Sequence, residues 1–194
     1  MRRIFILPAA LLLLIACQKQ APIGTVIGVK GSVTVEGRAA TAGMPLVEGA
    51  LVTVNEGGRI DLSLLGGHRL RLKEGALRLS RPGSNYLLSL PQGRLLVAVN
   101  KLAAGQRFDL NTPTTIAGVR GTMFLLEEKT NVGYVCVCEG VVETASVGSP
   151  EQRQKVSQGE DLWVKATEPA AAPVASPMMY KMTKADFIEM GVTP

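Results

Sequence analysis

Short apolar runs separated by glycine clusters constrain the fold of this chain more than any other feature. Within each run, branched aliphatic side chains recur at every second position, and residues two apart in a β-strand point to the same face of a sheet. The chain has 21 glycines and only 4% aromatic residues, which favours strands and tight turns over helices. The runs are residues 24–35, 51–54, 60–65, 70–79, 86–90, 95–99, 116–126 and 134–142, with turns predicted at 56–58, 66–67, 81–85 and 91–93. This regular spacing predicts an all-β domain of short strands.

The glycines also recur with a rough period. The spacing is 18 residues in one series and 19 in another, namely Gly57, Gly75 and Gly93, then Gly121, Gly140 and Gly159. Each of these glycines is interpreted as opening or closing a strand. Repeats near this length are typical of a β-solenoid, in which each turn of chain packs on its neighbours. A sandwich with regular hairpins would produce the same spacing, so the fold is expected to be solenoid-like or sandwich-like, with the solenoid favoured.

The β domain is expected to span residues 24–164. Residues 165–194 form an Ala- and Pro-rich linker followed by a short helix. Thr183 stands three residues before Asp186, which predicts the start of that helix, and Gly191 predicts its end. We expect the helix to dock back on the domain, although a partner could also receive it.

The first residues have the composition of a bacterial export signal. Arg2 and Arg3 precede an apolar run from Ile4 to Ile15, which is shorter than the roughly 20 residues that span a bilayer. Residues 14–17, Leu-Ile-Ala-Cys, resemble the lipobox of bacterial lipoproteins. The resemblance implies a signal peptide over residues 1–16, acylation of Cys17, and a lipidated cysteine with a short tether over residues 17–23. The alternative is an ordinary cleaved signal with a chance cysteine.

Charge and location exclude some partners. Without the two arginines of the signal, 19 basic and 16 acidic residues remain, a net charge of +3. That charge is too small to indicate nucleic-acid binding, and export to the cell envelope argues against it independently. We therefore expect the membrane, reached through acylated Cys17, and another envelope protein as partners. The residue after Cys17 is Gln18 and not an aspartate, which at this position would resemble an inner-membrane retention signal. The outer membrane is therefore favoured over the inner.

Residues 111–124 are the most specific segment after the signal. They contain Thr-Pro followed by Val-Arg-Gly-Thr-Met-Phe, and a later strand ends in Glu-Gly-Val-Val. This pattern resembles the FecR domain family, whose members carry Thr-Pro, then Val-Arg-Gly-Thr-x-Phe, then Glu-Gly-x-Val. The resemblance extends over roughly residues 24–159 and includes residues 28–35 and 64–72. Its motif residues here are Thr112, Pro113, Val119, Arg120, Gly121, Thr122, Phe124, Glu139 and Gly140.

The resemblance implies an all-β, solenoid-like envelope domain that binds partners and has neither catalytic activity nor a cofactor. Founding members of the family are iron-uptake regulators with a cytoplasmic anti-sigma segment and a transmembrane helix. This sequence shows neither feature, so we expect the domain to be used in a lipid-anchored protein rather than in transmembrane signalling. Two functions are predicted: binding of a protein partner as a sensor accessory or assembly scaffold, or, alternatively, binding of the cell wall or a lipid surface.

Basic residues form the candidate binding groups. Arg69, Arg71 and Lys73 alternate with leucines, so they share one strand face, which is either simply solvated or attracts an anionic surface. Strict alternation would turn Arg120 inward with Thr122, where a buried guanidinium needs polar partners. Arg120 is therefore interpreted as a structural clamp, unless Gly121 forms a bulge that turns it outward.

The remaining reactive side chains give little sign of chemistry. Cys136 and Cys138 alternate along one strand, at the far limit of disulfide geometry, and are interpreted as two core-facing thiols rather than a redox or metal site. His68 lies beside a glycine pair, where a solvent-facing side chain is expected. A single histidine leaves too few ligands for a metal centre, and no nucleophile elbow or phosphate-binding loop occurs. The sequence therefore predicts a protein that is not an enzyme.

Overall fold

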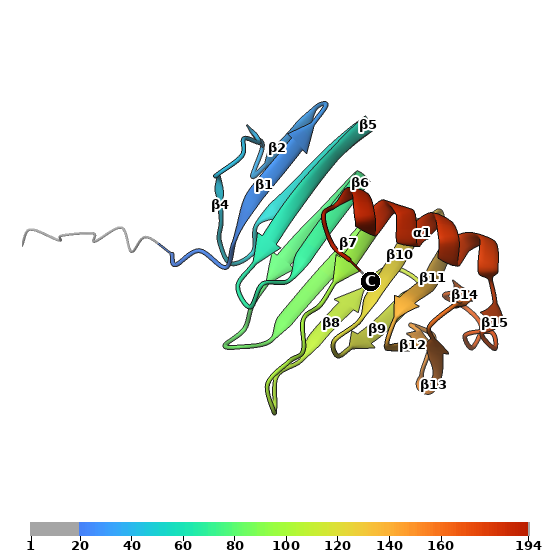
Figure 1. The fold of residues 1–194 in the computed structure, drawn as a ribbon. Helices are drawn as coiled ribbons and strands as arrows, with labels where there is room; N and C mark the ends of the chain where they lie inside the picture. The colour runs from blue at the N-terminus through green and yellow to red at the C-terminus, as the bar shows by residue number, and fades with distance from the viewer. Residues whose placement is uncertain (1–19, 194) are drawn as a thin grey trace, which may run out of the picture.

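Strands make up most of the chain in the computed structural model, which describes residues 20–193. Along these residues lie fifteen strands and a C-terminal helix (Figure 1). Their bounds are β1 (Gly24–Lys30), β2 (Val33–Val35), β3 (Arg38–Ala39), β4 (Pro45–Leu46), β5 (Leu51–Leu64), β6 (Arg69–Ser80), β7 (Tyr86–Ala98), β8 (Phe108–Asn111), β9 (Thr115–Val119), β10 (Met123–Lys129), β11 (Val132–Glu139), β12 (Val141–Ser146), β13 (Ser149–Ser157), β14 (Glu160–Lys165), β15 (Val174–Ala175) and α1 (Pro177–Glu189). The predicted signal peptide and Cys17 lie outside the described residues.

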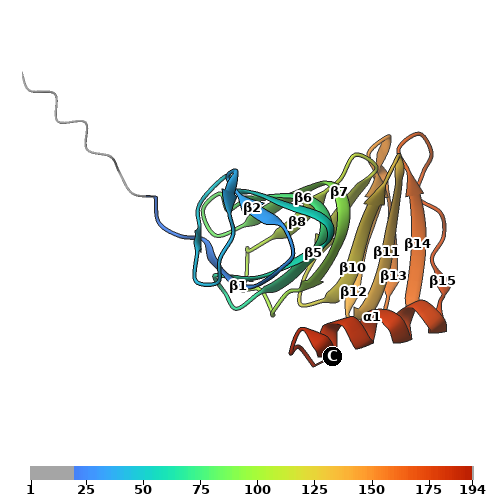
Figure 2. The same cartoon turned by 90° about the horizontal axis from the view of Figure 1, so that it is seen from above.

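All the strands belong to one curved sheet (Figure 2). Neighbours run antiparallel except for the parallel pair β7–β8. One edge of β7 pairs with β6, while its other edge pairs with β8 at residues 86–89 and with β10 at residues 93–98. From β7 the sheet therefore divides into two layers, β8-β9-β12-β13 and β10-β11-β14-β15.

The main core extends from strands β1, β2 and β4–β7 into the space between these two layers. Phe108 and Leu110 of β8 and Phe124 and Val135 of the opposite layer are fully buried in it. Burial of each such side chain stabilises the fold by about 1.5–3 kcal/mol. The prediction of an all-β domain is confirmed. Because nearly all neighbouring strands are antiparallel, the folded sheet corresponds to the sandwich-like alternative more than to the coils of a solenoid.

The 18-residue glycine period marks a bend rather than strand ends. Gly75 and Gly93 are paired neighbours in the middle of β6 and β7, and their φ angles are +113° and +121°. A Cβ atom on Gly75 would lie 2.0 Å from the carbonyl oxygen of Gln92, and one on Gly93 would lie 2.0 Å from that of Glu74. Long strands therefore bend where turns were predicted, at 56–58 in β5 and at 91–93 in β7. The interpretation of Gly57, Gly75 and Gly93 as strand ends is wrong. They recur every 18 residues because β5, β6 and β7 are long neighbouring strands, and each of them contains the bend once.

The C-terminal helix lies across the outer face of the β10–β11 layer (Figures 1 and 2). Phe187 is fully buried there, together with Leu96, Leu125 and Cys136 from the strands. The expectation that the helix docks back on the domain is confirmed. Within residues 20–193, no helix has the length and apolar character needed to cross a membrane.

The start of this helix differs from the prediction. It begins at Pro177, and Thr183 is a buried mid-helix residue rather than a cap. Pro177 starts the helix because its fixed φ suits the first turn and its missing N–H needs no partner there. The preceding segment is not a free linker, since β15 pairs with β14 and Ala170 is buried.

The bend yields a stability prediction. Gly75→Ala should lower the free energy of unfolding by more than about 2 kcal/mol, because the methyl group meets the Gln92 carbonyl and the backbone conformation is strained. Gly37→Ala is the matched control, since Gly37 has a φ of +72° but no heavy atom within 4 Å of its Cβ position. It should cost about 1 kcal/mol. Urea denaturation measures both, and equal losses would contradict the steric role of the bend.

Candidate functional site

A cleft of about 560 Å³ opens at one end of the two layers. Three chain segments meet there, namely the residues after β7, the β9–β10 turn and the β11–β12 turn, and Val192 and Thr193 border it after α1. Its polar side chains are Asn100, Lys101, Arg120, Thr122 and Glu139, and Ala98, Val99 and Met123 supply apolar surface. We call it the motif cleft because it contains motif residues from distant parts of the sequence.

Two motif glycines allow the turns of the motif cleft to pack closely. Gly121 and Gly140 have φ angles of +63° and +82°, and a Cβ atom on Gly140 would lie 2.9 Å from the carbonyl oxygen of Gly121. Thr122 joins the turns, since its hydroxyl donates to the Val141 carbonyl at 3.1 Å and its backbone pairs with Val99. The Arg-Gly-Thr and Glu-Gly motifs are thus the two sides of one structural feature.

Arg120 points out into solvent at this cleft. Its side chain is exposed, and within the described residues it makes no ion pair. The interpretation of Arg120 as a buried clamp is therefore wrong. Gly121 turns the chain at positive φ directly after it, which agrees with the alternative that a bulge turns the guanidinium outward.

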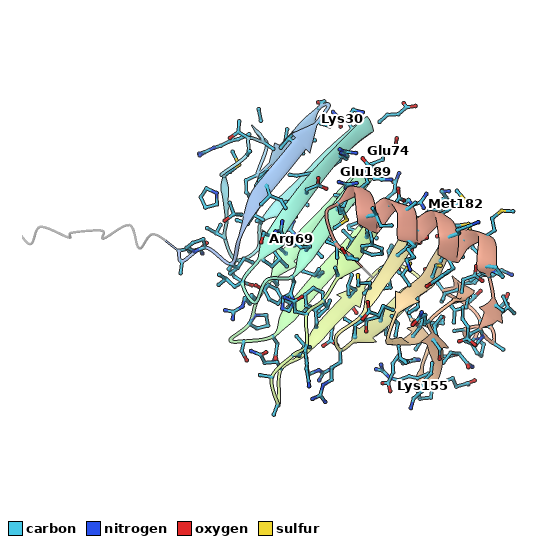
Figure 3. The ribbon with its side chains drawn as sticks, viewed as in Figure 1. Lys30, Arg69, Glu74, Lys155, Met182 and Glu189 are labelled. Atoms are coloured by element: carbon cyan, nitrogen blue, oxygen red, sulfur yellow. The ribbon has the colours of Figure 1, made fainter. Side chains whose placement is uncertain are left out.

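Two further basic residues lie at the same end. Lys101 is exposed in the lining of the cleft. Arg69, labelled in Figure 3, begins β6. It pairs across the strands with Ala98, which also lines the cleft. In the part of the chain that the structure describes, neither forms a salt bridge, so Lys101 and Arg120 in the cleft lining, and Arg69 on the strand beside it, carry charges available to a ligand.

His68 supports the cleft from below. Its Nδ1 accepts a hydrogen bond from the Asn100 backbone N–H at 3.1 Å, and the ring packs edge-on against Tyr86 and Phe108. The expected solvent-facing position is wrong, because the ring is only 5% exposed and the glycine turn folds over it. Burial, and secondarily the positive charge of Arg81, lower the pKa of His68 below its usual 6.5.

The Thr-Pro motif lies at the opposite end of the same strands. Thr112 is buried and Pro113 is exposed, and both belong to the turn between β8 and β9. The Thr112 hydroxyl accepts from the backbone N–H groups of Thr114 and Thr115 and donates to Glu128 at 2.5 Å. This motif therefore organises a turn and does not contribute to the cleft.

Glu128 is the residue of this network that the sequence did not reveal. It is 2% exposed and accepts hydrogen bonds from Thr112 and Thr114, the latter at 2.6 Å. The adjacent Glu127 points to the other face, as strand alternation requires. Alternation from buried Phe124 could have indicated that Glu128 points inward. Val119 and Phe124, the remaining motif residues, are buried in the main core.

The predicted basic face is divided rather than open. Arg69 is exposed, but Arg71 is 2% exposed and forms a bidentate pair with Asp61 at 2.6 and 3.0 Å. Lys73 pairs with Asp186 of α1 at 2.8 Å. The proposal of one binding face formed by all three is therefore wrong, because the helix covers the part that contains Arg71 and Lys73.

The two cysteines face the helix, and the prediction of buried thiols is confirmed. Both are free and buried beneath α1, on the outer face of β11. Burial is the main cause that raises the pKa of both thiols, to about 12 for Cys138. Over residues 20–193, no group of three or more His, Cys, Asp and Glu side chains is arranged to hold a metal ion.

Solved structures share this fold. Two crystal structures of a candidate anti-sigma factor from Parabacteroides distasonis ATCC 8503, at 1.65 and 2.50 Å resolution, superpose with a TM-score of 0.58 at 19% identity. Each match covers 73% of this chain and 65% or 64% of the other chain. The class is thus an all-β domain of the kind found in that protein. No curated protein matches the sequence.

Residues 50–143 match the model described as FecR protein. The FecR family match thus extends over 94 of the 194 residues. The match runs from the turn before β5 into β12 and includes every motif residue from Thr112 to Gly140. The strands that contain residues 28–35, which also resemble the family, lie outside it.

The buried histidine makes stability depend on pH. Because the folded-state pKa lies below the unfolded value near 6.5, the unfolded chain binds the extra proton first as pH falls. Stability should be fully present above pH 6.5 and should fall below it, by up to about 1.4 kcal/mol per pH unit. Urea denaturation between pH 7.5 and 5.0 measures this, and His68→Gln should give the flatter curve. Parallel curves for the two proteins would contradict the assignment.

Proposed function

We propose that this protein is a non-catalytic, lipid-anchored envelope protein whose FecR domain binds another protein at the motif cleft. The observation that carries the proposal is the convergence of the Arg-Gly-Thr and Glu-Gly turns on one cleft with exposed charges. Arg120 does not stabilise the fold through an ion pair with any described residue, so its charge is available for a partner. The FecR domain and the fold shared with a candidate anti-sigma factor support a regulatory or sensory role rather than catalysis.

The lining of the motif cleft suits a protein ligand. Lys101 and Arg120 can pair with carboxylates, Glu139 can pair with a basic side chain, and Met123 offers an adaptable apolar contact. Loops held by a rigid sheet are a common place for binding residues. The cleft therefore combines a fixed scaffold with the mixed chemistry that a polypeptide segment presents.

The anchor would hold the cleft near the membrane. Ile23 is buried, and its carbonyl accepts hydrogen bonds from the Leu65 N–H and the Tyr86 hydroxyl. The adjacent Gly66 carbonyl accepts from Asn100 in the cleft. Five residues lie between Cys17 and Ile23, so the six Cα-to-Cα steps from one to the other reach at most about 20 Å. With Cys17 acylated, the cleft would face partners at or close to the membrane surface.

A second function has one specific observation in its favour. Arg69, Lys101 and Arg120 are exposed at the end of the domain that the tether would hold near lipid. Such cations attract anionic headgroups, each contributing about 1 kcal/mol near the surface. Binding to a lipid or cell-wall surface is therefore the alternative to binding a protein.

Site-specific photo-crosslinking in intact cells tests the binding surface. A photo-reactive residue at Lys101 should capture a discrete envelope protein, whereas one at Thr130, in the turn at the opposite end of β10, should not. Arg120→Ala should leave the free energy of unfolding within about 0.5 kcal/mol of wild type, because the side chain is exposed. It should reduce the amount of crosslinked product several-fold. A product that is equal at both positions, or unchanged by Arg120→Ala, would overturn the assignment of the cleft. Crosslinks to lipid or wall polymer alone, weakening as salt rises, would favour the alternative.

Metabolic labelling with an alkyne fatty acid tests the anchor. Cys17→Ser should abolish labelling and release the protein from the membrane fraction, because one residue is expected to carry the lipid. Cys138→Ser is the matched control and should keep both properties, since that thiol is buried. Labelling that survives Cys17→Ser would show that the lipobox resemblance is misleading.

A further inference from the structure

The outer face of β5, β6 and β7 carries a strip of cations under the C-terminal half of α1. Arg59, Arg71, Lys73 and Arg94 form this basic strip. Among their salt-bridge partners, the only acid that belongs to the strands is Asp61. The helix supplies the other carboxylates of these ion pairs, so without it Asp61 would be the one remaining partner of the four cations.

The helix meets this strip with two carboxylates one turn apart. Asp186 pairs with Lys73 at 2.8 Å and lies 3.6 Å from Arg94. Glu189, which is labelled in Figure 3, pairs with Arg59 and lies 3.6 Å from Arg71 in the same structure. Phe187 stands between them in the sequence and enters the apolar patch beside the strip. The contact is therefore that of a helix end, which presents two carboxylates and one apolar side chain, on a basic and apolar strand face.

The helix leaves part of this surface unsatisfied. Arg71 is 2% exposed, yet its Nη1 has no hydrogen-bond partner among the described residues. The Nε of Arg94 is likewise buried without one. A buried guanidinium donor normally finds a partner, so the strip could accept more hydrogen bonds than α1 provides.

The helix is also weakly held. Of its thirteen residues only Thr183 and Phe187 are buried, and its ion pairs with Lys73 and Arg59 are partly exposed, where such pairs contribute little. Met178 is 73% exposed. Met182, which is labelled in Figure 3, is 53% exposed on the outward side of the helix. A helix of this length is marginal in water once it leaves the sheet. Undocking of α1 would leave the hydrogen-bonded strand pairs of the β layers in place, since the helix contributes none of them.

We propose that the basic strip and the adjoining apolar patch form a binding site for an acidic amphipathic helix of a partner protein, with α1 as its resident occupant. The partner helix would present two carboxylates three residues apart, as Asp186 and Glu189 do, with an apolar residue between them. It would displace α1 and reach the unsatisfied donors of Arg71 and Arg94. This site goes beyond the proposed function, because it requires neither the motif cleft nor Cys17.

The buried thiols report on this exchange. Thr183 lies 3.9 Å from the sulfur of Cys136, and the Tyr180 carbonyl lies 4.0 Å from that of Cys138. In the Cys17→Ser protein, reagents for free thiols reach these two cysteines only when α1 leaves. Asp186→Lys with Glu189→Lys should speed labelling at least tenfold, whereas Met182→Gln, on the outward side, should leave the rate within twofold.

A synthetic peptide of residues 174–193 is the probe for occupancy. Added to the Asp186→Lys, Glu189→Lys protein, it should slow thiol labelling at least fivefold, and this protection should weaken as salt rises. The same peptide with both carboxylates replaced by lysine should not protect. A lack of protection by the wild-type peptide would overturn the proposal.

The unmodified helix supplies an independent measurement if the double variant does not fold. In the Cys17→Ser protein, raising the salt concentration from 50 mM to 1 M should speed labelling at least fivefold without lowering the denaturation midpoint. Labelling that occurs only at the rate of global unfolding, at both salt concentrations, would show that α1 is a fixed part of the fold and would overturn the proposal. Neither result depends on the crosslinking at Lys101.

Discussion

The carbonyl oxygens of Glu74 and Gln92 occupy the space in which Cβ atoms on residues 93 and 75 would lie. This close approach bends β6 and β7 together in mid-strand, so one long sheet folds over instead of remaining flat. Folding over places Phe108 opposite Phe124 and creates a core between two layers. It also brings the turns that follow β7, β9 and β11 to one end, where the motif cleft forms. The cleft therefore depends on the bend in the middle of β6 and β7, although of these two strands only the end of β7 lines it.

Polar groups buried at the two ends of the layers fix the loops there. His68 accepts from the Asn100 backbone below the cleft, and Glu128 accepts from Thr112 and Thr114 at the far end. Each of these side chains has little access to water, so loss of its partner would leave a buried polar group unsatisfied. Loops held in this way keep a defined shape while their outer side chains, such as Arg120, stay free to contact another molecule.

The sequence predicted the all-β class and the core-facing cysteines because both follow from period-two alternation, which is local. The strand ends were not predictable, since a glycine cluster can make a turn or a bend, and only the pairing of Gly75 with Gly93 decides between them. Arg120 could not be placed by alternation because Gly121 interrupts it. The motif cleft could not be predicted from the sequence, because Lys101 and Glu139 come together in its lining only when the sheet folds over. The position of His68 was missed for a similar reason, since Tyr86 and Phe108 come from other strands.

Helix α1 has apolar side chains on both its inner and its outer side, so no hydrophobic stripe indicates which side docks. The ion pairs of Asp186 and Glu189 with the strands decide the orientation. They also divide the cations of the sheet into two groups with different fates. Arg71 and Lys73 are neutralised within the chain, whereas Arg69, two residues earlier on the same face, keeps its charge near the cleft. Arg69 therefore leaves a positive charge exposed near the motif cleft. Displacement of the helix would extend that positive surface along β6, from the motif cleft to the basic strip.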